Sequence, residues 1–572
     1  MMKIENREYN LLDFVKIPFS ISPIVTILQI IDMIINAMIP SLKIMVTAGF
    51  IDTAINIFNG QEDKSKLNIW LLWILILISY KYITSAFILI MKEKMRIKLT
   101  EVFRIAVTEK RARLHYKHVE NDETWDLVER VGKDPAEKIR EGFDILLSMV
   151  SIFVRVFSLM VMLWAHVWWA SLVIILISTP LFWLAVRSGK VNYQAFKDAT
   201  THKRKANYLQ GILTSRDNVE ERVLFAYSKE INNRYYDKFW TAYKIEFKAQ
   251  LDRFLKMRGA SQITIIISVL ISFVLIPPLD LGLISVGMFT SFVSATFGLT
   301  HLMSWELSRI MSKLTGNMEY LKDLTDFSKL TEVEGAIDAP VKTVKEPAFI
   351  EFIDVSFSYP GTDIKILNRF NLKLLTKKHY AFVGVNGAGK TTVTKLLTGQ
   401  YTNYTGDILI EGRDLRDFSQ SELKATFSIV YQDFAKYQIC MSDSITLGNI
   451  YDKAGERIKE AVKILELDKV ISKLPDGLNT PLGKIVSSGV DLSGGEWQRV
   501  AIARSIVSSN PIKILDEPTA ALDPIAESRI YNLFDKISKG KSTIFITHRL
   551  GAAKLADEII LIADGMVAEK GS

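Results

Sequence analysis

The segment Gly384-Val385-Asn386-Gly387-Ala388-Gly389-Lys390-Thr391 has residue types and a spacing that suit phosphate chemistry. It fits the pattern G-x-x-x-x-G-K-[ST], in which glycines permit a tight loop whose backbone N–H groups face phosphates at a helix N-terminus. The apolar run YAFVGV precedes it and the helical run TTVTKLLTG follows it, which disfavours a chance glycine-rich turn. Lys390 is expected to direct its charge at the β- and γ-phosphates, and the hydroxyl of Thr391 to ligate Mg²⁺.

Two adjacent carboxylates, Asp516 and Glu517, end the apolar run IKILDE. Since Mg²⁺ prefers oxygen ligands, Asp516 is expected to hold it directly or through water. Glu517 is then placed to polarise an attacking water as general base. Taken alone, such a pair is usually a solvated strand end, so its meaning depends on the glycine-rich loop. Lys513 is unexpected in a buried strand, and it predicts that one face of the strand end is exposed.

A third candidate is Leu492-Ser493-Gly494-Gly495-Glu496, which is followed by the helical run WQRVAIARS. A helix N-terminus with small residues offers N–H groups and a hydroxyl to phosphate. Alone, it reads as a flexible loop. Its position some 20 residues before the Asp–Glu strand makes Ser493, Gly494 and Gly495 candidates for phosphate contacts.

The first half of the chain is expected to lie in a membrane, and the second half, which carries these residues, is expected to be a soluble α/β domain. A chain of 572 residues exceeds what one core holds, and its first 330 or so residues carry long apolar runs. A bilayer-spanning helix needs roughly 20 mainly apolar residues. Six predicted spans lie near residues 21–50, 69–91, 143–165, 168–186, 260–276 and 283–311, the first of which contains Asp32 and Lys43.

The placement of basic residues predicts how these spans are oriented. Residues 92–142 hold 13 Lys and Arg and residues 187–258 hold 16, whereas the short connections hold only Lys64 and Lys66. The positive-inside rule puts both basic segments, the N-terminus and the C-terminal half in the cytoplasm. The net charge of +8 therefore fits a membrane protein, and the lack of a basic–aromatic stripe disfavours nucleic acid as a partner. The alternative is a soluble helical bundle, which this charge asymmetry disfavours.

Each basic segment contains a candidate capped helix, near residues 121–131 and 215–225. Short polar residues precede both, as at helix starts. We expect these helices to dock on the nucleotide domain through Trp125 and Phe225; the alternative is a pair of capped helices on a solvated surface. The aperiodic segment 331–346 reads as a linker. The expected domains are thus 1–330 in the membrane, the linker 331–346, and 347–572 as the nucleotide domain.

Taken together, the motifs resemble those of the ABC transporter family, and the six-span half resembles its exporters. The resemblance implies a six-span α-helical membrane domain followed by an α/β P-loop ATPase domain that binds ATP and Mg²⁺. It also implies that Tyr359 stacks on adenine, that Gln432 senses Mg²⁺ and the membrane domain, that His548 contacts the γ-phosphate, and that Asp523 links two sites. The implied nucleotide-binding residues are Tyr359, Gly384, Asn386, Gly387, Ala388, Gly389, Lys390, Thr391, Thr392, Gln432, Ser493, Gly494 and Gly495, with Thr391, Gln432 and Asp516 at Mg²⁺ and with Glu517 and His548 as catalytic residues.

Members of that family sandwich ATP between two nucleotide domains, so the resemblance implies a dimer, either with a second copy of this chain or with a different one. The segments VYQDF and DEPTAALDPIAE look most like bacterial lantibiotic and bacteriocin exporters of the kind that lacks a cysteine peptidase, since the one cysteine, Cys440, lies in the second half. The expected substrate is a peptide. A lipid or hydrophobic-drug exporter with the same fold remains the alternative.

Ionisable residues inside the spans are the sequence's own indication of a substrate site. Arg155 lies in the third span, and His301, Glu306 and Arg309 lie in the sixth. Such residues usually face a cavity or a partner. Glu306 and Arg309 are three apart, and the preferred interpretation is that they pair with each other. The other interpretation is that they line a substrate cavity.

Overall fold

The structure, a computed structural model, describes residues 2–166, 168, 194–195, 198–216, 218–301, 306–342, 344–451, 455–518, 541–547 and 553–572. It divides into two compact units. Unit 1 comprises Met1–Glu109 and Leu127–Lys329, and unit 2 comprises Lys110–Asp126 and Leu330–Ser572. A short part of the first basic segment therefore folds with the C-terminal half.

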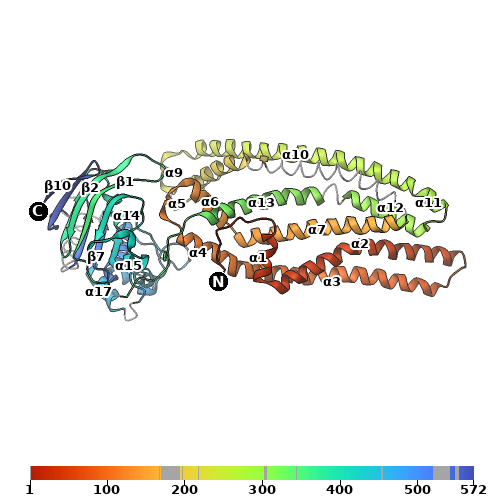
Figure 1. Ribbon diagram of the computed structural model, residues 1–572, viewed down its shortest axis with the longest axis horizontal. Helices are drawn as coiled ribbons and strands as arrows, with labels where there is room; N and C mark the ends of the chain where they lie inside the picture. Colours follow the sequence, from red (N-terminus) through yellow and green to blue (C-terminus); the bar gives the residue numbers. More distant parts are fainter. Residues whose placement is uncertain are drawn as a thin grey trace. The chain divides into compact units, whose positions relative to one another are not determined.

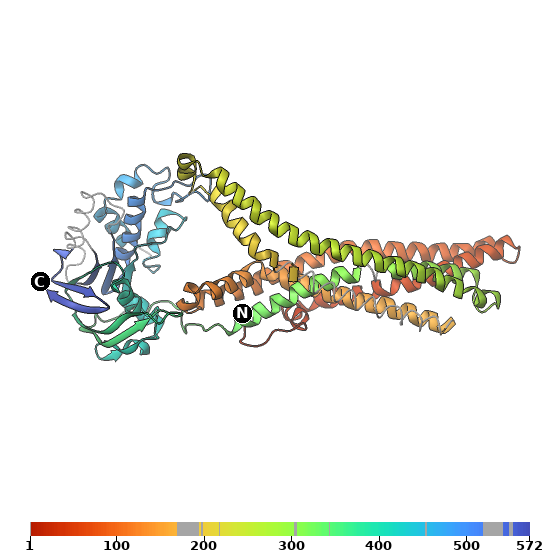
Figure 2. The ribbon, with the colours of Figure 1, turned by 90° about the horizontal axis from the view of Figure 1, so that it is seen from above.

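Unit 1 is helical, and its long helices lie side by side along much of their length (Figures 1 and 2). Their apolar composition suits lipid, where a helix is favoured because it satisfies all of its own backbone groups. The helices, including two that cross into unit 2, are α1 (Asp13–Ile21), α2 (Pro23–Phe58), α3 (Leu67–Leu99), α4 (Ile105–Arg113), α6 (Asp122–Gly132), α7 (Pro135–His166), α9 (Val219–Phe225), α10 (Ser228–Val274), α11 (Ile276–Asp280), α12 (Val286–His301) and α13 (Leu307–Lys329).

Three helical stretches among the described residues are long and apolar enough to cross a membrane: Pro23–Phe58, Lys64–Arg113 and Pro135–Ala165. They coincide with the first three predicted spans. The fourth predicted span falls almost wholly outside the described residues. The fifth lies within α10 and α11, and the sixth falls on α12 and α13. The number of six spans therefore stays a prediction.

Close contact between α2 and α12 organises one end of unit 1. The Asp52 carboxylate accepts hydrogen bonds from Ser285 Oγ (2.5 Å) and from Gly287 N–H (2.7 Å) at the start of α12. A carboxylate there satisfies free N–H groups of the helix and its positive end. A side chain at Gly287 would put its Cβ 2.2 Å from the Ala48 carbonyl oxygen, so only glycine allows this approach.

Glu306 does not pair with Arg309, contrary to the preferred interpretation of the sequence. Its carboxylate lies 3.8 Å from Arg155 Nη1 on α7, and Arg309 is exposed. The side chain of His301 lies outside the described residues. The partner of Glu306 thus comes from another helix, which the spacing along one helix could not indicate.

Unit 2 contains two sheets among its described residues. One is antiparallel with the order β2 (Lys365–Leu375), β1 (Phe349–Ser358), β4 (Thr405–Ile410), β5 (Arg413–Asp414). The other has the order β10 (Met566–Gly571), β9 (Glu558–Ala563), β3 (His379–Val383), β8 (Ser542–Ile546), β7 (Ile512–Asp516), β6 (Phe427–Val430), and is parallel from β9 to β6. Its helices are α5 (Tyr116–Glu120), α14 (Lys390–Leu397), α15 (Gln420–Thr426), α16 (Met441–Thr446), α17 (Glu456–Ile464), α18 (Asp468–Ile471) and α19 (Gly494–Val507).

Two hydrophobic cores hold unit 2 together. One joins both sheets to α14 through Phe352, Phe382 and Leu396, and the other packs α16–α19 against the far strands through Trp497 and Leu515. Burying these side chains is the main driving force for the fold. The parallel strands are nearly continuous apolar runs, as expected for strands covered on both faces.

The predicted linker 331–346 begins as a paired segment. His115 N–H donates to the Thr331 carbonyl (3.2 Å), and Val333 N–H donates to the Arg113 carbonyl (2.7 Å). Lys110 Nζ lies 2.5 Å from the Glu332 carboxylate. The start of the linker is therefore fixed to the same stretch of chain that carries α5.

Candidate nucleotide-binding site

The carboxyl ends of three parallel strands bring the predicted site residues to one edge of the sheet. The glycine-rich loop follows β3, Gln432 follows β6, and Asp516 ends β7, with Glu517 next in the chain. Ligands of open α/β sheets bind outside the carboxyl ends of the strands. The topology thus assembles residues that lie more than 120 positions apart in the sequence.

The loop adopts a conformation that its glycines make possible. Gly389 caps α14 at a φ of 102°, and a Cβ there would lie 2.8 Å from Leu367 Cδ2. A Cβ at Gly384 would lie 2.2 Å from the Ile562 carbonyl oxygen. Lys390 Nζ donates to the carbonyls of Gly384 (2.8 Å) and Val385 (2.9 Å). The ammonium group therefore lies inside the loop whose N–H groups would surround a phosphate.

Asp516 and Thr391 form the oxygen pair that a divalent cation requires. Thr391 Oγ1 donates to Asp516 Oδ2 at 3.0 Å. Burial raises the pKa of Asp516 to about 6, against the lowering effects of the Thr391 hydrogen bond and the Lys390 charge. Among the described residues, buried Asp516 Oδ1 has no hydrogen-bond partner. A hydroxyl beside a buried carboxylate with an unused oxygen fits Mg²⁺.

Glu517 is held in an uncommon backbone conformation. Its φ is 47°, and its N–H donates to the Ile546 carbonyl at 3.0 Å. A non-glycine residue in this region costs on the order of 1 kcal/mol, and such residues cluster at functional sites. Gln432 Nε2 donates to Glu517 Oε2 at 3.0 Å, so Gln432 orients this carboxylate here.

Tyr359 belongs to an aromatic cluster beside α14. Its hydroxyl shares a hydrogen bond with Thr392 Oγ1 (3.0 Å), and its ring meets that of Tyr401 edge-on at 5.5 Å. Lys395 Nζ lies 5.2 Å from the centre of the Tyr359 ring, a cation–π contact. The predicted adenine-stacking residue thus contacts the first turns of α14, the helix that follows the phosphate loop.

The helix that contacts this cluster is α5, and it lies just before the predicted docking helix at 121–131. The Tyr116 ring meets Tyr401 edge-on at 5.6 Å, and Lys395 Nζ lies 2.7 Å from Glu120 Oε1. The Tyr401 hydroxyl donates to Glu120 Oε2. Trp125, the predicted anchor, is 37% exposed. Sequence reasoning missed all four contact residues, although Lys395 follows Thr391 by one helical turn on the same face.

The Ser493 segment forms the start of α19. The Ser493 side chain accepts from Glu496 N–H, and the Glu496 carboxylate accepts from Ser493 N–H and Oγ at 2.8 Å each. This capping box makes Ser493, Gly494 and Gly495 a rigid helix N-terminus.

Lys513 corrects a sequence-based prediction. We expected it to mark an exposed face of its strand, but all five residues of β7 are buried. Its Nζ donates to the carbonyls of Ser505 and Ser508 at the end of α19. Burial lowers the pKa of Lys513 to about 7. The end of a helix, not solvent, accommodates this side chain.

Several predicted residues are not brought to the site by the described structure. His548 and Asp523 lie outside the described residues. Phe225 belongs to α9 of unit 1, where it is exposed together with Val223 and Leu224. Docking of α9 on a nucleotide domain therefore stays a prediction.

The chain has relatives of known class. The sequence profile of the ABC transporter family matches residues 367–520. The subtilin transport ATP-binding protein SpaT of Bacillus subtilis is 31% identical over 474 residues, which cover 82% of this chain and 76% of the relative. The ATP-dependent lipid A-core flippase of Escherichia coli K12 is 28% identical over 460 residues, covering 78% and 76%. The structure of a bacterial Atm1-family ABC exporter with ATP bound superposes with a TM-score of 0.76 at 22% identity and covers 95% of each chain.

The fold and the site thus define an ATP-driven exporter, in which an apolar helical unit is joined to an ATPase unit. The chain belongs to the ABC transporter family, as its motifs indicated. It is a multi-pass membrane protein that couples ATP hydrolysis to transport.

Proposed function

We propose that this chain exports a peptide across the cytoplasmic membrane as a homodimer of half-transporters, with its N-terminus and nucleotide domain in the cytoplasm. In this proposal the membrane domain ends near residue 330 and the nucleotide domain begins near residue 347. The observation that carries the ATPase part is the group of Thr391, Asp516, Glu517 and Gln432 at one sheet edge. The relative named for subtilin transport supports the peptide part.

Each residue of the site has a separate role in the proposed hydrolysis of ATP. Lys390 would exchange the carbonyls of Gly384 and Val385 for phosphate oxygens, since all of these are acceptors for its ammonium group. Thr391 and Asp516 would hold Mg²⁺, which neutralises phosphate charge when bound. Glu517 would take the proton from the attacking water, oriented by the Gln432 amide.

The position of the Ser493 segment supports the proposed dimer. It caps α19, and none of its hydrogen bonds that involve Ser493 reaches the glycine-rich loop. In the sandwich implied by the family resemblance, this segment serves the ATP held by a second copy. Each copy of this chain supplies both Glu517 and the Ser493 segment, so two copies would complete two sites.

Replacing Glu517 with Gln tests the ATPase assignment. We expect ATP binding to persist and hydrolysis to fall by roughly 10²- to 10⁴-fold, because a general base contributes about that much. Turnover close to that of the wild type in purified protein would exclude Glu517 from this role.

The substrate class requires a separate measurement. Liposomes containing the protein would be supplied with ATP and fluorescent subtilin outside, and peptide accumulation would be measured against the Glu517→Gln variant. The relative named as a lipid A-core flippase favours a second candidate, a lipid. ATP-dependent movement of labelled lipid A without peptide accumulation would favour that candidate.

A further inference from the structure

Unit 1 contains a cavity of about 780 Å³ between α2, α7 and α12, and both apolar and polar side chains line it. Its size is typical of ligand sites, which span roughly 300–1,000 Å³. Among the described residues that line it, three are ionisable: Lys43 from α2, Arg155 from α7, and Glu306, which immediately precedes α13. Hydroxyl groups surround them, from Ser41, Thr47, Thr290, Ser291 and Ser294. Lys43 and Arg155 belong to two of the helices that can cross a membrane.

The charges in this cavity do not cancel. Arg155 and Glu306 form a loose ion pair at 3.8 Å, with about a quarter of each side chain exposed. Lys43 is exposed toward the cavity. Two cations and one anion leave one positive charge. At membrane depth an ionisable side chain is costly and usually marks a substrate or ion pathway.

Two polar atoms of the lining residues lack a protein partner among the described residues. They are Ser291 Oγ, on a residue that is 4% exposed, and Arg155 Nε. A buried polar group without a partner costs roughly 1–3 kcal/mol. The Ser41 and Ser158 hydroxyls, by contrast, bond to each other at 2.6 Å. A ligand with acceptor oxygens would satisfy both unpaired groups.

We propose that this cavity binds a carboxylate of the transported peptide, with Lys43 and Arg155 as its counter-charges. The proposal rests on the peptide export proposed above. A single carboxylate balances the single excess charge, whereas a doubly charged phosphate group would leave one negative charge without a counter-charge. Arg155 presents a planar fork of N–H donors that matches a carboxylate. Glu306 would remain as the partner that keeps Arg155 in place.

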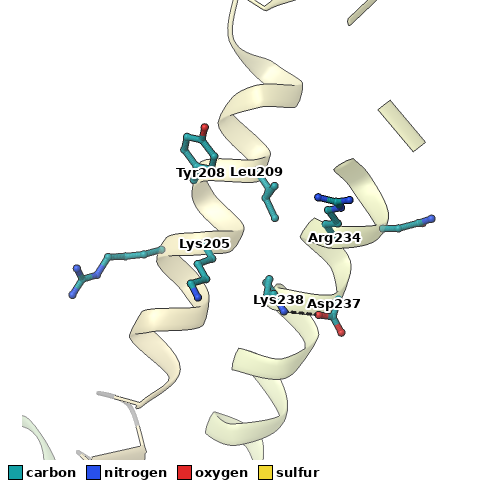
Figure 3. Close-up of a pocket in the computed structure, with 8 residues that line it drawn as sticks. Lys205, Tyr208, Leu209, Arg234, Asp237 and Lys238 are labelled. Atoms are coloured by element: carbon teal, nitrogen blue, oxygen red, sulfur yellow. Dashed lines mark hydrogen bonds and ion pairs between the residues drawn. The ribbon is translucent and has the colours of Figure 1, made fainter. Parts of the chain in front are cut away.

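A second cavity of about 780 Å³ lies on α10 and differs in its charges. Its lining includes Arg234 and Lys238 from α10, with Lys205 on the neighbouring helix (Figure 3). Lys238 pairs with Asp237 at 2.9 Å, and Arg234 pairs with Glu230 at 2.7 Å. Arg234 and Lys238 are therefore already compensated by carboxylates on their own helix.

The test compares two pools of random decapeptides, one with a free C-terminal carboxylate and one with a C-terminal carboxamide. The full-length protein in nanodiscs would be titrated with each pool, and ATP hydrolysis would be measured. We expect the concentration that gives half-maximal stimulation to be about tenfold higher or more for the carboxamide pool than for the carboxylate pool. The reason is that the carboxamide loses a charge-assisted hydrogen bond. Lys43→Met should bring the two concentrations close together.

Two further variants separate binding from folding. Arg155→Gln combined with Glu306→Gln removes the ion pair without leaving a buried charge, and it should also abolish the preference. Lys64→Met removes a lysine that does not line the cavity, and it should preserve the preference. A wild-type protein that responds equally to both pools would overturn the proposal, as would a preference that survives Lys43→Met and the double substitution.

The outcomes also separate this site from the export proposal. If both pools stimulate hydrolysis equally and accumulate in liposomes, peptide export stands and the carboxylate site is wrong. If neither pool stimulates the protein while basal hydrolysis is intact, both proposals fail. Stimulation by nanodiscs that contain lipid A, lost in Lys43→Met, would then assign the cavity to a phosphate-bearing lipid.

Discussion

Replacing Glu120 with Gln is expected to weaken the docking of α5 while keeping its shape. The Glu120 carboxylate lies 2.7 Å from Lys395 Nζ and accepts from the Tyr401 hydroxyl. Burial works to lower the pKa of Lys395, but the Glu120 hydrogen bond and the nearby tyrosines hold it above its ordinary value. The ammonium group therefore stays charged, and the substitution leaves it without its carboxylate.

The structure sets the size of this effect. A hydrogen bond to a charged group contributes roughly 1.5–3 kcal/mol, whereas an exposed ion pair contributes about 0.2–1 kcal/mol. The two side chains are 18% and 37% exposed, which places this contact between those limits. A loss of about 1–2 kcal/mol would shift the docking equilibrium by roughly 5- to 30-fold.

The readout is coupling, since Glu120 does not contact the glycine-rich loop. Glu120→Gln protein in liposomes should retain most basal ATP hydrolysis but lose substrate-stimulated hydrolysis and transport. Amide exchange in residues 116–120 should become faster. Trp125→Ala is the matched control, because the Trp125 ring contacts the guanidinium of Arg111, whose Cζ lies 5.8 Å from the ring centre, rather than Lys395 or Tyr401. It should retain coupling, although the sequence alone nominated Trp125 as the anchor.

Two results would refute this reasoning. One is wild-type transport and wild-type amide exchange in Glu120→Gln, which would show that the contact carries no free energy. The other is a larger loss of coupling in Trp125→Ala than in Glu120→Gln. A failure of Glu120→Gln to bind ATP would instead point to damage in the aromatic cluster, and Tyr116→Phe, which keeps the ring contact, would serve as the folded reference.

Three further predictions concern other parts of the chain. Lys390→Ala should weaken ATP binding, measured by calorimetry, because the loop loses its cation; an unchanged affinity would contradict this. Burial lowers the pKa of Lys513 to about 7, so between pH 7 and about 10 the unfolded chain holds a proton on Lys513 that the folded chain has released. The melting temperature of the wild type should therefore rise from pH 7 to 9. Lys513→Met should remove that rise. Asp52→Ala should destabilise unit 1 by roughly 1–3 kcal/mol, because two donors at the start of α12 lose their acceptor, and a thermal scan in detergent that shows no lower melting temperature would count against it.

The parts of the site that consist of consecutive residues could be predicted from the sequence. The glycine-rich loop, the strand before it and the helix after it follow from consecutive residues, so their geometry was accessible without coordinates. The same holds for the carboxylates at 516 and 517, whose strand is apolar apart from Lys513. Bringing these segments together required only the rule that carboxyl ends of parallel strands share an edge.

The errors have one physical cause, which is that the side chains pair with groups on other helices or strands. Glu306 had Arg309 three residues away, yet it pairs with Arg155, 151 positions earlier. Lys513 looked incompatible with burial because the carbonyls that accept from it belong to the end of α19, which packing brings to its strand. No periodicity reports such contacts. They depend on how helices and strands pack.

The position of Lys395 links docking to nucleotide binding. Its ammonium group lies 5.2 Å from the centre of the Tyr359 ring and 5.3 Å from that of Tyr116, and it pairs with Glu120. A base that stacks on Tyr359 would lie near this cation and would change the environment of the group that holds α5. The segment 110–126 is covalently continuous with unit 1 at both ends, and any shift of α5 therefore acts on α4 and α6. By thermodynamic linkage, if nucleotide tightens this contact, the contact must tighten nucleotide binding by the same factor. Lys395 thus joins α5 to the predicted adenine-stacking residue within unit 2.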